Sequence, residues 1–468
     1  MSLRGKACVA GVLFATAISS GAQTFTTLAY FPEGTVFVSS LVQGRDGSFY
    51  GTSYDQGTGG YGLVFKVTPS GMLTTLYRFC TQANCADGSL SFGALTLGTD
   101  GSFYGTTQNG GANGLGVAFK LTPEGAYTVL HSFGGADGSY PDAGLVLASD
   151  GNFYGATSSG GSTSCVGYGS GCGAVFRMTS AGTVTTLHSF DGTDGWGPEA
   201  LVQGTDGSLY GTTYHGGTNV YACGGCGTVF KITTGGEFTS LHSFDFLDGS
   251  NPNAPLVQAR GEFYGTTFEG GYVAFEGCSS GCGTIFKISS SGAFATVHEF
   301  HFGDGGSLES GLLEATDGNL YGESPDEGNG NVISLTLPAT VTTVYSFPSE
   351  DGSGGYTAPL QATDGEFYGI YGGNYDGVPA VFSLGTGLGP FVAFVIASGR
   401  VGQTAEILGQ GFTGTSSVTF NGVAAESYSV VSDTYLTAVV PSGATTGAVV
   451  VITPGGVLTS NVGFRIGE

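Results

Sequence analysis

Residues 200–244 read ALVQGTDGSLYGTTYHGGTNVYACGGCGTVFKITTGGEFTSLHSF, and this stretch decides the fold because its pattern recurs along most of the chain. Four short runs rich in Val, Thr, Phe and Tyr are separated by turn signals at Asp206-Gly207, Gly216-Gly217 and Gly235-Gly236. The pattern predicts four consecutive antiparallel strands. A sheet this small cannot bury both of its faces alone, so we expect the copies to pack on one another.

The turn motif Asp-Gly-x-Phe/Leu-Tyr-Gly, which enters the second strand, is present in six copies, and a seventh has Arg in place of Asp; the copies are spaced by 47 to 57 residues. The copies begin at Asp46, Asp100, Asp150, Asp206, Arg260, Asp317 and Asp364. A third strand follows every copy, and a fourth strand follows the first six. The seventh copy has none, but a matching segment, FTTLAYF from Phe25 to Phe31, precedes the first copy.

This displaced strand predicts a closed ring, because an N-terminal strand that completes the last sheet removes an exposed edge. We therefore expect an all-β fold in which residues 23–385 form a seven-bladed β-propeller closed by the N-terminal strand. Repeats of this length are typical of propeller blades. The long second-to-third-strand and inter-repeat loops should lie on one face of the ring and the short Asp-Gly turns on the other. The loop face is the expected binding face.

Composition and charge favour an exported β protein. The chain has 468 residues, 88 of them Gly, and only 10% are charged. Arg4 and Lys6 precede an apolar run from Ala7 to Ile18, so residues 1–22 are expected to be a secretory signal peptide. Without it, 36 acidic and 12 − 2 = 10 basic residues give a net charge of −26. This charge argues against nucleic acid and anionic membranes as partners, and no later segment is apolar enough to span a bilayer.

The combination of DGxFYGT, GG, GTVFKIT and TTLHSF resembles the GloVer-type tandem repeat of bacterial exported proteins, over roughly residues 25–385. The match is looser in the last two copies, where Ser334 and Ser383 replace the basic residue of the third strand. The resemblance implies the repeat fold and export. It implies no reaction.

After a Gly/Pro linker at residues 386–390 the pattern changes. Residues 391–468 resemble an IPT/TIG immunoglobulin-like domain, with matching turns that include Gly411-Phe412, Phe420-Asn421-Gly422 and Gly455-Gly456. The familiar Pro at the exit of the first strand is replaced by Ile396-Ala397. The resemblance implies a β-sandwich, and a spacer is its expected role. In other proteins such domains also mediate dimerisation or accompany carbohydrate-active domains.

The loop face combines aromatic and acidic residues, a mixture that suits sugar rings and hydroxyls or a cationic protein partner. Asp142 and Glu199 are among its acids. The alternative is that these tyrosines cover the sheets and the acids cap turns. The predicted ligand-binding residues are Tyr140, Trp196, Tyr214, Tyr221, Tyr272, Tyr371, Asp194 and Asp248.

Eight cysteines remain after the signal peptide, in four local pairs, and export with short spacing predicts disulfides. The pairs are Cys80 with Cys85, Cys165 with Cys172, Cys223 with Cys226, and Cys278 with Cys282. Two alternatives stay open. The last four cysteines could hold zinc between neighbouring blades, or Cys223-Gly-Gly-Cys226 could be a redox motif that lacks the usual following helix.

No catalytic constellation emerges, and we expect no cofactor. His131, His188, His242 and His298 share one register of the fourth strand, which indicates architecture. Gly277 to Gly281 fits G-x-S-x-G without the strand-turn-helix elbow that this motif needs. A ring of Asp-Gly acids around the pore could hold Ca²⁺, although Asx turns also explain it. The sequence therefore predicts a non-enzymatic exported protein that binds an extracellular glycan or protein. The alternative is a polysaccharide lyase or glycosidase that uses loop carboxylates.

Overall fold

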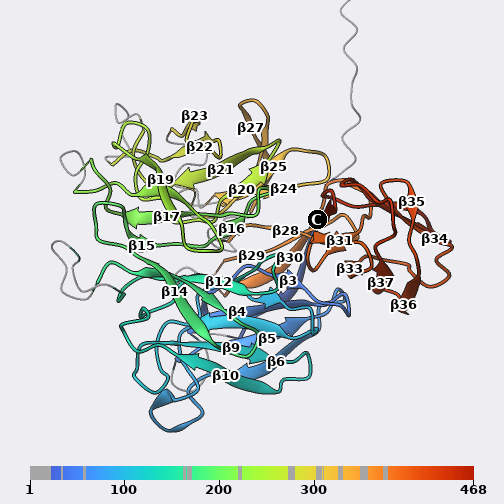
Figure 1. Ribbon diagram of the computed structural model, residues 1–468, viewed down its shortest axis with the longest axis horizontal. Coiled ribbons are helices and arrows are strands. Elements are labelled where there is room, and N and C mark those ends of the chain that lie inside the picture. Colours follow the sequence, from blue (N-terminus) through green and yellow to red (C-terminus); the bar gives the residue numbers. More distant parts are fainter. Residues whose placement is uncertain are drawn as a thin grey trace, which may run out of the picture.

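The computed structural model describes residues 23–32, 35–55, 60–161, 165, 171–219, 224–271, 280–301, 308, 310–324, 330–347, 357–372 and 378–467. In this part of the chain all regular structure is β strand, apart from the short 3-10 helix η1 (Ala83–Cys85). None of its helices is long and apolar enough to cross a membrane. Figure 1 shows the sheets of the repeats in one body and the C-terminal strands beside it. The fold is therefore all-β, as predicted.

Each repeat forms one antiparallel sheet. Repeat 1 contains β2 (Val36–Val38), β3 (Val42–Gln43), β4 (Phe49–Asp55), β5 (Leu63–Val67) and β6 (Leu73–Arg78), and repeat 2 contains β7 (Thr96–Leu97), β8 (Phe103–Thr107), β9 (Val117–Leu121) and β10 (Tyr127–Ser132). Repeat 3 contains β11 (Val146–Leu147), β12 (Phe153–Thr157), β13 (Ala174–Met178) and β14 (Val184–Ser189). Repeat 4 contains β15 (Trp196–Pro198), β16 (Val202–Gln203), β17 (Leu209–His215), β18 (Thr228–Ile232) and β19 (Phe238–Ser243).

The remaining repeats follow the same order. Repeat 5 contains β20 (Val257–Ala259), β21 (Glu262–Thr267), β22 (Thr284–Ile288) and β23 (Phe294–Glu299), and repeat 6 contains β24 (Leu313–Glu314), β25 (Leu320–Ser324), β26 (Asn331–Thr336) and β27 (Thr340–Ser346). Repeat 7 supplies β28 (Leu360–Gln361), β29 (Phe367–Tyr371) and β30 (Ala380–Gly385).

Strand β1 (Thr24–Tyr30) completes the sheet of repeat 7 by pairing antiparallel with β30. The fourth strand of the other repeats bulges at one aliphatic residue, as at Leu130 in β10, and β1 has the same bulge at Leu28. In both cases the carbonyl oxygen of the bulged residue faces a turn glycine of the next repeat, Gly182 beside Leu130 and Gly71 beside Leu28. The predicted pairing of the N-terminal strand with the last repeat is confirmed.

The Asp-Gly-x-Phe-Tyr motif ties each turn to its own sheet and to the next one, as repeat 2 illustrates. Asp100 Oδ1 accepts a hydrogen bond from Ser102 N at 3.0 Å, and Asp100 Oδ2 accepts from Tyr104 Oη at 2.9 Å and from Lys120 Nζ at 2.6 Å. The Tyr104 ring stacks on Phe153 of repeat 3, with centroids 4.1 Å apart. The tyrosine-to-aspartate bond recurs at Asp46, Asp150, Asp206, Asp317 and Asp364.

Neighbouring sheets pack together in chain order, and the last sheet packs against the first. Each neighbouring pair shares a buried hydrophobic cluster. Between repeats 7 and 1, the Tyr368 ring lies 4.1 Å from the Phe49 ring, and Thr363 N donates to Gln43 Oε1 at 3.1 Å. The packing of the repeats thus returns to its starting point.

The glycine of the Tyr-Gly step leaves room for the third strand's aromatic ring. A Cβ at Gly155 would lie 2.6 Å from Phe176 Cζ and 2.8 Å from Leu145 Cδ2. In repeat 6 the residue opposite the glycine is Ile333, and a Cβ at Gly322 would meet Leu312 Cδ2 at 3.0 Å and no other side-chain or backbone atom closer than 3.6 Å.

We expect Gly155→Ala to lower the free energy of unfolding by about 1–3 kcal/mol, because both contacts are with packed side chains. Gly322→Ala is its matched control, and we expect a change within about 1 kcal/mol because the added methyl also restricts the unfolded chain. Urea denaturation followed by circular dichroism measures both. Equal losses in the two variants would contradict this account of the motif.

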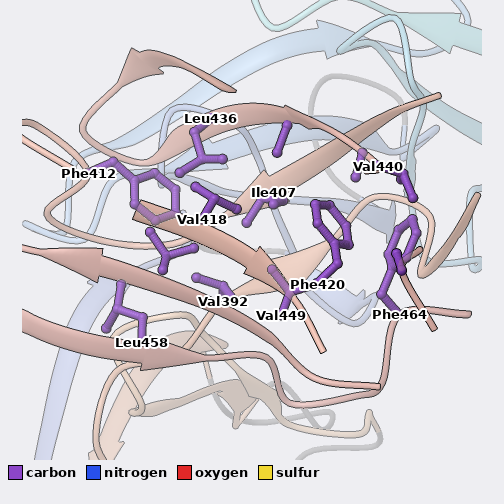
Figure 2. Packing of buried hydrophobic residues seen from close by; sticks show 14 residues of the cluster. Val392, Ile407, Phe412, Val418, Phe420, Leu436, Val440, Val449, Leu458 and Phe464 are labelled. Atoms are coloured by element: carbon purple, nitrogen blue, oxygen red, sulfur yellow. The ribbon is translucent and has the colours of Figure 1, made fainter. Parts of the chain in front are cut away.

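The C-terminal strands build two facing sheets around a separate core. One sheet contains β31 (Ala393–Phe394), β33 (Thr404–Leu408), β37 (Tyr435–Val439) and β36 (Tyr428–Ser432), and the other contains β35 (Val423–Ala424), β34 (Ser417–Phe420), β38 (Val449–Thr453) and β39 (Gly456–Thr459). Strands β32 (Ser398–Gly399) and β40 (Arg465–Ile466) pair in parallel. Figure 2 shows buried side chains of the C-terminal strands and loops meeting in one cluster, which includes Ile407, Phe412, Phe420, Leu436 and Val449. We call residues 391–467 the C-terminal unit.

The C-terminal unit packs on the Asp-Gly turns of several repeats. Arg45 Nη2 in the turn of repeat 1 donates to Glu406 Oε2 at 2.7 Å, and its guanidinium lies 4.5 Å from the centre of the Tyr435 ring. Gln410 Nε2 donates to Thr363 Oγ1 of repeat 7 at 3.1 Å, and Arg465 donates to backbone carbonyls in the turn of repeat 4.

The turn face therefore carries a second structural unit. From the sequence we placed only the short Asp-Gly turns on this face. Leu408 and Tyr435 belong to the buried cluster shared by repeats 1 and 2, so the unit is packed against the repeats. Its expected role as a spacer stays a prediction. The sequence expectation missed this contact because it arises from single residues in individual turns, which the repeat pattern does not contain.

Candidate functional site

A cavity of about 580 Å³ lies where the first strands of the repeats begin. Every repeat contributes the segment just before the short strand that precedes its Asp-Gly turn, which is β3, β7, β11, β16, β20, β24 or β28. These segments are represented by Ser39, Phe92, Asp142, Glu199, Asn253, Gly311 and Thr357. In repeat 1, Ser39 N donates to Thr52 O in β4, close to the end of β4 from which the long connections leave. The C-terminal unit contacts the other end of the sheets, so the cavity lies on the loop side. Its volume suits a small organic ligand.

Two carboxyl groups from neighbouring repeats give the cavity its chemistry. Burial, reinforced by the charge of Asp142, raises the pKa of Glu199 to about 8. Burial also raises the pKa of Asp142, against hydrogen bonds with Ser158 and Gln108 that lower it. Both side chains line the cavity and are partly exposed to it. Near neutral pH at least one of the two carboxyls is therefore protonated.

Polar oxygens in the cavity wall are left without hydrogen-bond partners. Asp142 Oδ1, Asn253 Oδ1 and Thr357 Oγ1 are buried and bond to none of the residues that the structure describes. Buried polar atoms are usually satisfied, and exceptions need an explanation. The rest of the lining is largely apolar and includes the Phe92 ring and Leu145. An apolar wall with a few convergent polar groups is typical of a ligand site.

The raised pKa of Glu199 predicts a pH-dependent cost to stability. The folded state holds this proton more tightly than the unfolded state, so proton binding stabilises the fold. This stabilisation is fully present below about pH 4.5 and is lost as the pH rises towards 8. Because the cavity admits solvent, we expect Glu199→Gln to gain only about 1–2 kcal/mol over the wild type between those limits. Urea denaturation at both ends of this range measures the gain. Glu237→Gln, at an exposed turn, is the control, and identical pH slopes for Glu199→Gln and wild type would contradict the prediction.

None of the predicted aromatic residues that the structure describes lines the cavity. Tyr140 lies in a loop with a positive φ of 57°. Trp196 in β15 stacks on His215 with centroids 4.8 Å apart, and Tyr214 meets the same ring edge-on at 4.5 Å. Both were expected in loops but lie on strands, so that expectation was wrong. Tyr221 and Tyr272 lie outside the described residues.

Tyr371 was also predicted to bind a ligand on the loop face, and this prediction was wrong because its side chain is buried. It ends strand β29, is 1% exposed and packs in the cluster of repeats 6 and 7. Its hydroxyl bonds to Thr27 Oγ1 of β1 at 2.7 Å, and Phe25 of β1 lies against its ring at 5.5 Å. The ring therefore helps to hold the N-terminal strand and is not exposed to a ligand.

Asp194 and Asp248 close turns in the connections between repeats 3 and 4 and between repeats 4 and 5. Asp194 Oδ2 pairs with His188 Nε2 at 2.8 Å, and its Oδ1 accepts from Asp191 N at 2.9 Å. Asp248 repeats this pattern with His242 Nε2 at 2.8 Å. The turn-capping alternative therefore describes both residues, and the shared histidine register is structural at these positions.

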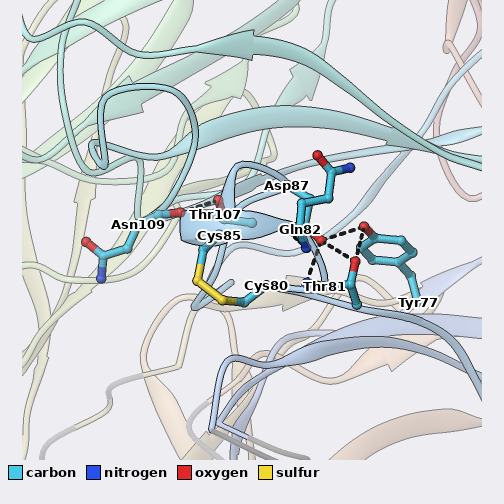
Figure 3. The surroundings of a disulfide bond; sticks show 8 residues. All are labelled: Tyr77, Cys80, Thr81, Gln82, Cys85, Asp87, Thr107 and Asn109. Carbon is cyan, nitrogen blue, oxygen red and sulfur yellow. Dashed lines mark hydrogen bonds between the residues drawn. A yellow bond between two sulfur atoms is a disulfide. The ribbon is translucent and has the colours of Figure 1, made fainter.

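The disulfides of two predicted pairs are present, joining Cys80 to Cys85 and Cys165 to Cys172. Figure 3 shows the first beside Asp87, whose carboxylate accepts hydrogen bonds from Tyr77, Thr81 and Gln82. Cys226 and Cys282 are also disulfide-bonded. Their predicted partners, Cys223 and Cys278, lie outside the described residues. Disulfides are typical of oxidising compartments.

Among the described residues, no group of three or more His, Cys, Asp or Glu side chains could hold a metal ion. Asp142 and Glu199 were predicted only as two of many acids on the loop face. The signal that could have found them is positional. Asp142 precedes β11 by four residues and Glu199 precedes β16 by three, and the cavity-lining residues at these positions in repeats 1, 2, 5 and 7 are Ser39, Phe92, Asn253 and Thr357.

Comparisons with known proteins give one family and a set of remote folds. The family model of the Gloeobacter/Verrucomicrobia repeat matches residues 1–168 and 163–382. No curated protein matches the sequence. A gluconolactonase from Xanthomonas campestris is 12% identical with a TM-score of 0.40, covering 77% of this chain and 97% of that one. A puromycin-hydrolyzing peptidase from Mycobacterium tuberculosis is 12% identical with a TM-score of 0.47, covering 82% of this chain and 60% of that one.

Proposed function

The chain belongs to the Gloeobacter/Verrucomicrobia repeat family, and from that premise we propose that its seven repeats are the blades of a β-propeller closed by β1. The contacts between repeats 7 and 1 support this arrangement. We further propose that residues 1–22 are a signal peptide, that residues 23–385 are the propeller and that residues 391–468 are an immunoglobulin-like domain of the IPT/TIG type. The two facing sheets of the C-terminal unit support the last assignment.

On this architecture the cavity is the loop end of the central channel, and the protein is an exported binding protein whose cavity takes a small hydroxyl-rich ligand, such as a terminal sugar of a glycan. One observation carries the proposal: a cavity of about 580 Å³ lined by the same segment of every repeat. The Phe92 ring offers an apolar surface for a sugar face. The oxygens of Asp142, Asn253 and Thr357 offer acceptors for hydroxyl groups.

Calorimetry of the purified mature protein with a panel of monosaccharides and disaccharides tests the proposal. We expect binding by at least one sugar and its loss in Ala200→Phe, which fills the cavity from its wall. Ala181→Phe, at an exposed turn, should bind as the wild type does. If no sugar binds, or if both variants bind equally, the cavity is not a sugar site.

The carboxyl pair favours a second candidate, a glycosidase or lyase. A protonated Glu199 near neutral pH, beside the Asp142 carboxyl, has the properties of a general acid with a second carboxylate at hand. The test is product analysis after incubation with any glycan that binds. New reducing ends that disappear in Glu199→Gln would support an enzyme, and binding without turnover would leave the binding protein.

A further inference from the structure

The charges of the cavity wall are one-sided. Asp142 and Glu199 line it, and its described lining residues include no Lys, Arg or His. Two carboxyls without a cationic partner favour a ligand that supplies positive charge.

The hydrogen-bonding groups of the wall point to the same ligand. Ser39 Oγ donates to Ser40 O and Ser91 Oγ donates to Thr106 O at 2.7 Å, so both hydroxyl protons are used within the protein. Asp142 Oδ1 and Asn253 Oδ1 are acceptors without a donor among the described residues. A primary ammonium brings three N–H donors and no acceptor. It can bond to these two acceptors and brings the charge that the carboxyls favour, while the unpartnered Thr357 hydroxyl, which both donates and accepts, is left for a hydroxyl group of the same ligand.

We propose that the cavity recognises an amino sugar with a free amine, whose ammonium group binds between Asp142 and Glu199. This inference rests on the proposed sugar-binding function and names the class of sugar. The Phe92 ring and the apolar wall then contact the face of the sugar ring. Sugar acids are excluded because their carboxylate would face two acidic side chains.

Glucosamine, N-acetylglucosamine and glucose form the test series, because they share the ring and differ at one substituent. Calorimetry at about pH 7 should show glucosamine binding at least roughly 10-fold more tightly than the other two, as expected for a charge-assisted hydrogen bond. Asp142→Asn and Glu199→Gln keep the shape of each side chain and should remove this preference. Glu237→Gln, at an exposed turn, should retain it.

A second readout follows from the proton on the carboxyl pair. Glu199 has a pKa of about 8 in the free protein, so an ammonium beside it should displace a proton at about pH 7. Calorimetry in buffers of different ionisation enthalpy should detect net proton release for glucosamine, up to one per site, and none in Glu199→Gln. A purely structural role for Glu199 would not produce this release.

The outcomes separate the two proposals. Equal affinity for glucosamine and glucose, both abolished by Ala200→Phe, would overturn the amine preference and leave the sugar-binding cavity. If none of the three sugars and no other sugar in the panel binds, both the sugar-binding cavity and the amine preference are overturned. Equally tight binding of an aliphatic amine without a sugar ring would show that the charge alone is recognised, which would overturn the assignment to amino sugars.

Discussion

A chain of residues 31–468 should lose the packing of repeat 7 against repeat 1, with a fall in melting temperature of about 10 °C or more relative to residues 23–468 and a tendency to associate. The missing segment is β1, which pairs along β30 from Thr24 to Tyr30. Its removal would expose the edge of β30 to solvent and to other chains. It would also remove Phe25, whose ring lies 4.5 Å from Tyr345 and 5.5 Å from Tyr371.

The melting temperature by circular dichroism and the molecular mass by size-exclusion chromatography measure this effect. A synthetic peptide of residues 23–32 added in excess should restore the melting temperature, because strand and sheet would pair again. Phe25→Ala should reproduce part of the loss, about 2–3 kcal/mol for a partly buried ring. Tyr30→Ala is the matched control, since that side chain is 60% exposed. An unchanged melting temperature in the truncated chain would show that β1 does not hold the repeats together.

The displaced strand could be predicted from the sequence because a repeat leaves the same pattern wherever it occurs. The segment FTTLAYF matched six other fourth strands, and β1 even has their bulge, at Leu28. The glycine of the Tyr-Gly step recurs in the same way and is visible in the sequence. The reason for it, which in repeat 3 is the Phe176 ring packed against Gly155, is visible only in the structure. Repetition is therefore the strongest signal in this chain.

The candidate site could not be predicted because it depends on what differs between repeats. Asp142 and Glu199 face one cavity, yet they stand at slightly different distances from their strands and among many other acids. Tyr371 was misplaced because the sequence does not show that β29 continues to this residue. Its burial depends on β1, which comes from the other end of the repeat region of the chain. Such long-range contacts leave no local pattern.

Replacement of Arg45 by alanine should loosen the C-terminal unit from the repeats. Arg45 stands directly before the Asp-Gly turn of repeat 1. Its side chain contacts Glu406 and Tyr435 of the C-terminal unit and Thr99 of repeat 2. Its Nη2 donates to Glu406 Oε2 at 2.7 Å and to Thr99 O at 2.6 Å, while its guanidinium covers the Tyr435 ring. Burial raises the pKa of Glu406, and the charge of Arg45 opposes that shift. Without Arg45 the half-buried Glu406 carboxylate would have lost its cationic partner.

Breaking a buried ion pair costs about 3–5 kcal/mol, but both side chains here are partly exposed, at 25% and 17%, so we expect about 2–3 kcal/mol for Arg45→Ala. Because this energy holds two units together, the loss should appear as faster proteolysis in the linker at residues 386–390 and as a separate, earlier unfolding transition in urea. Arg400→Ala, at an exposed arginine of the same unit, should change neither. The double variant Arg45→Ala with Glu406→Gln should recover part of the loss, because no unpaired carboxylate remains at the contact. A single, unshifted transition in Arg45→Ala would mean that the apolar contacts of Leu408 and Tyr435 alone hold the unit in place.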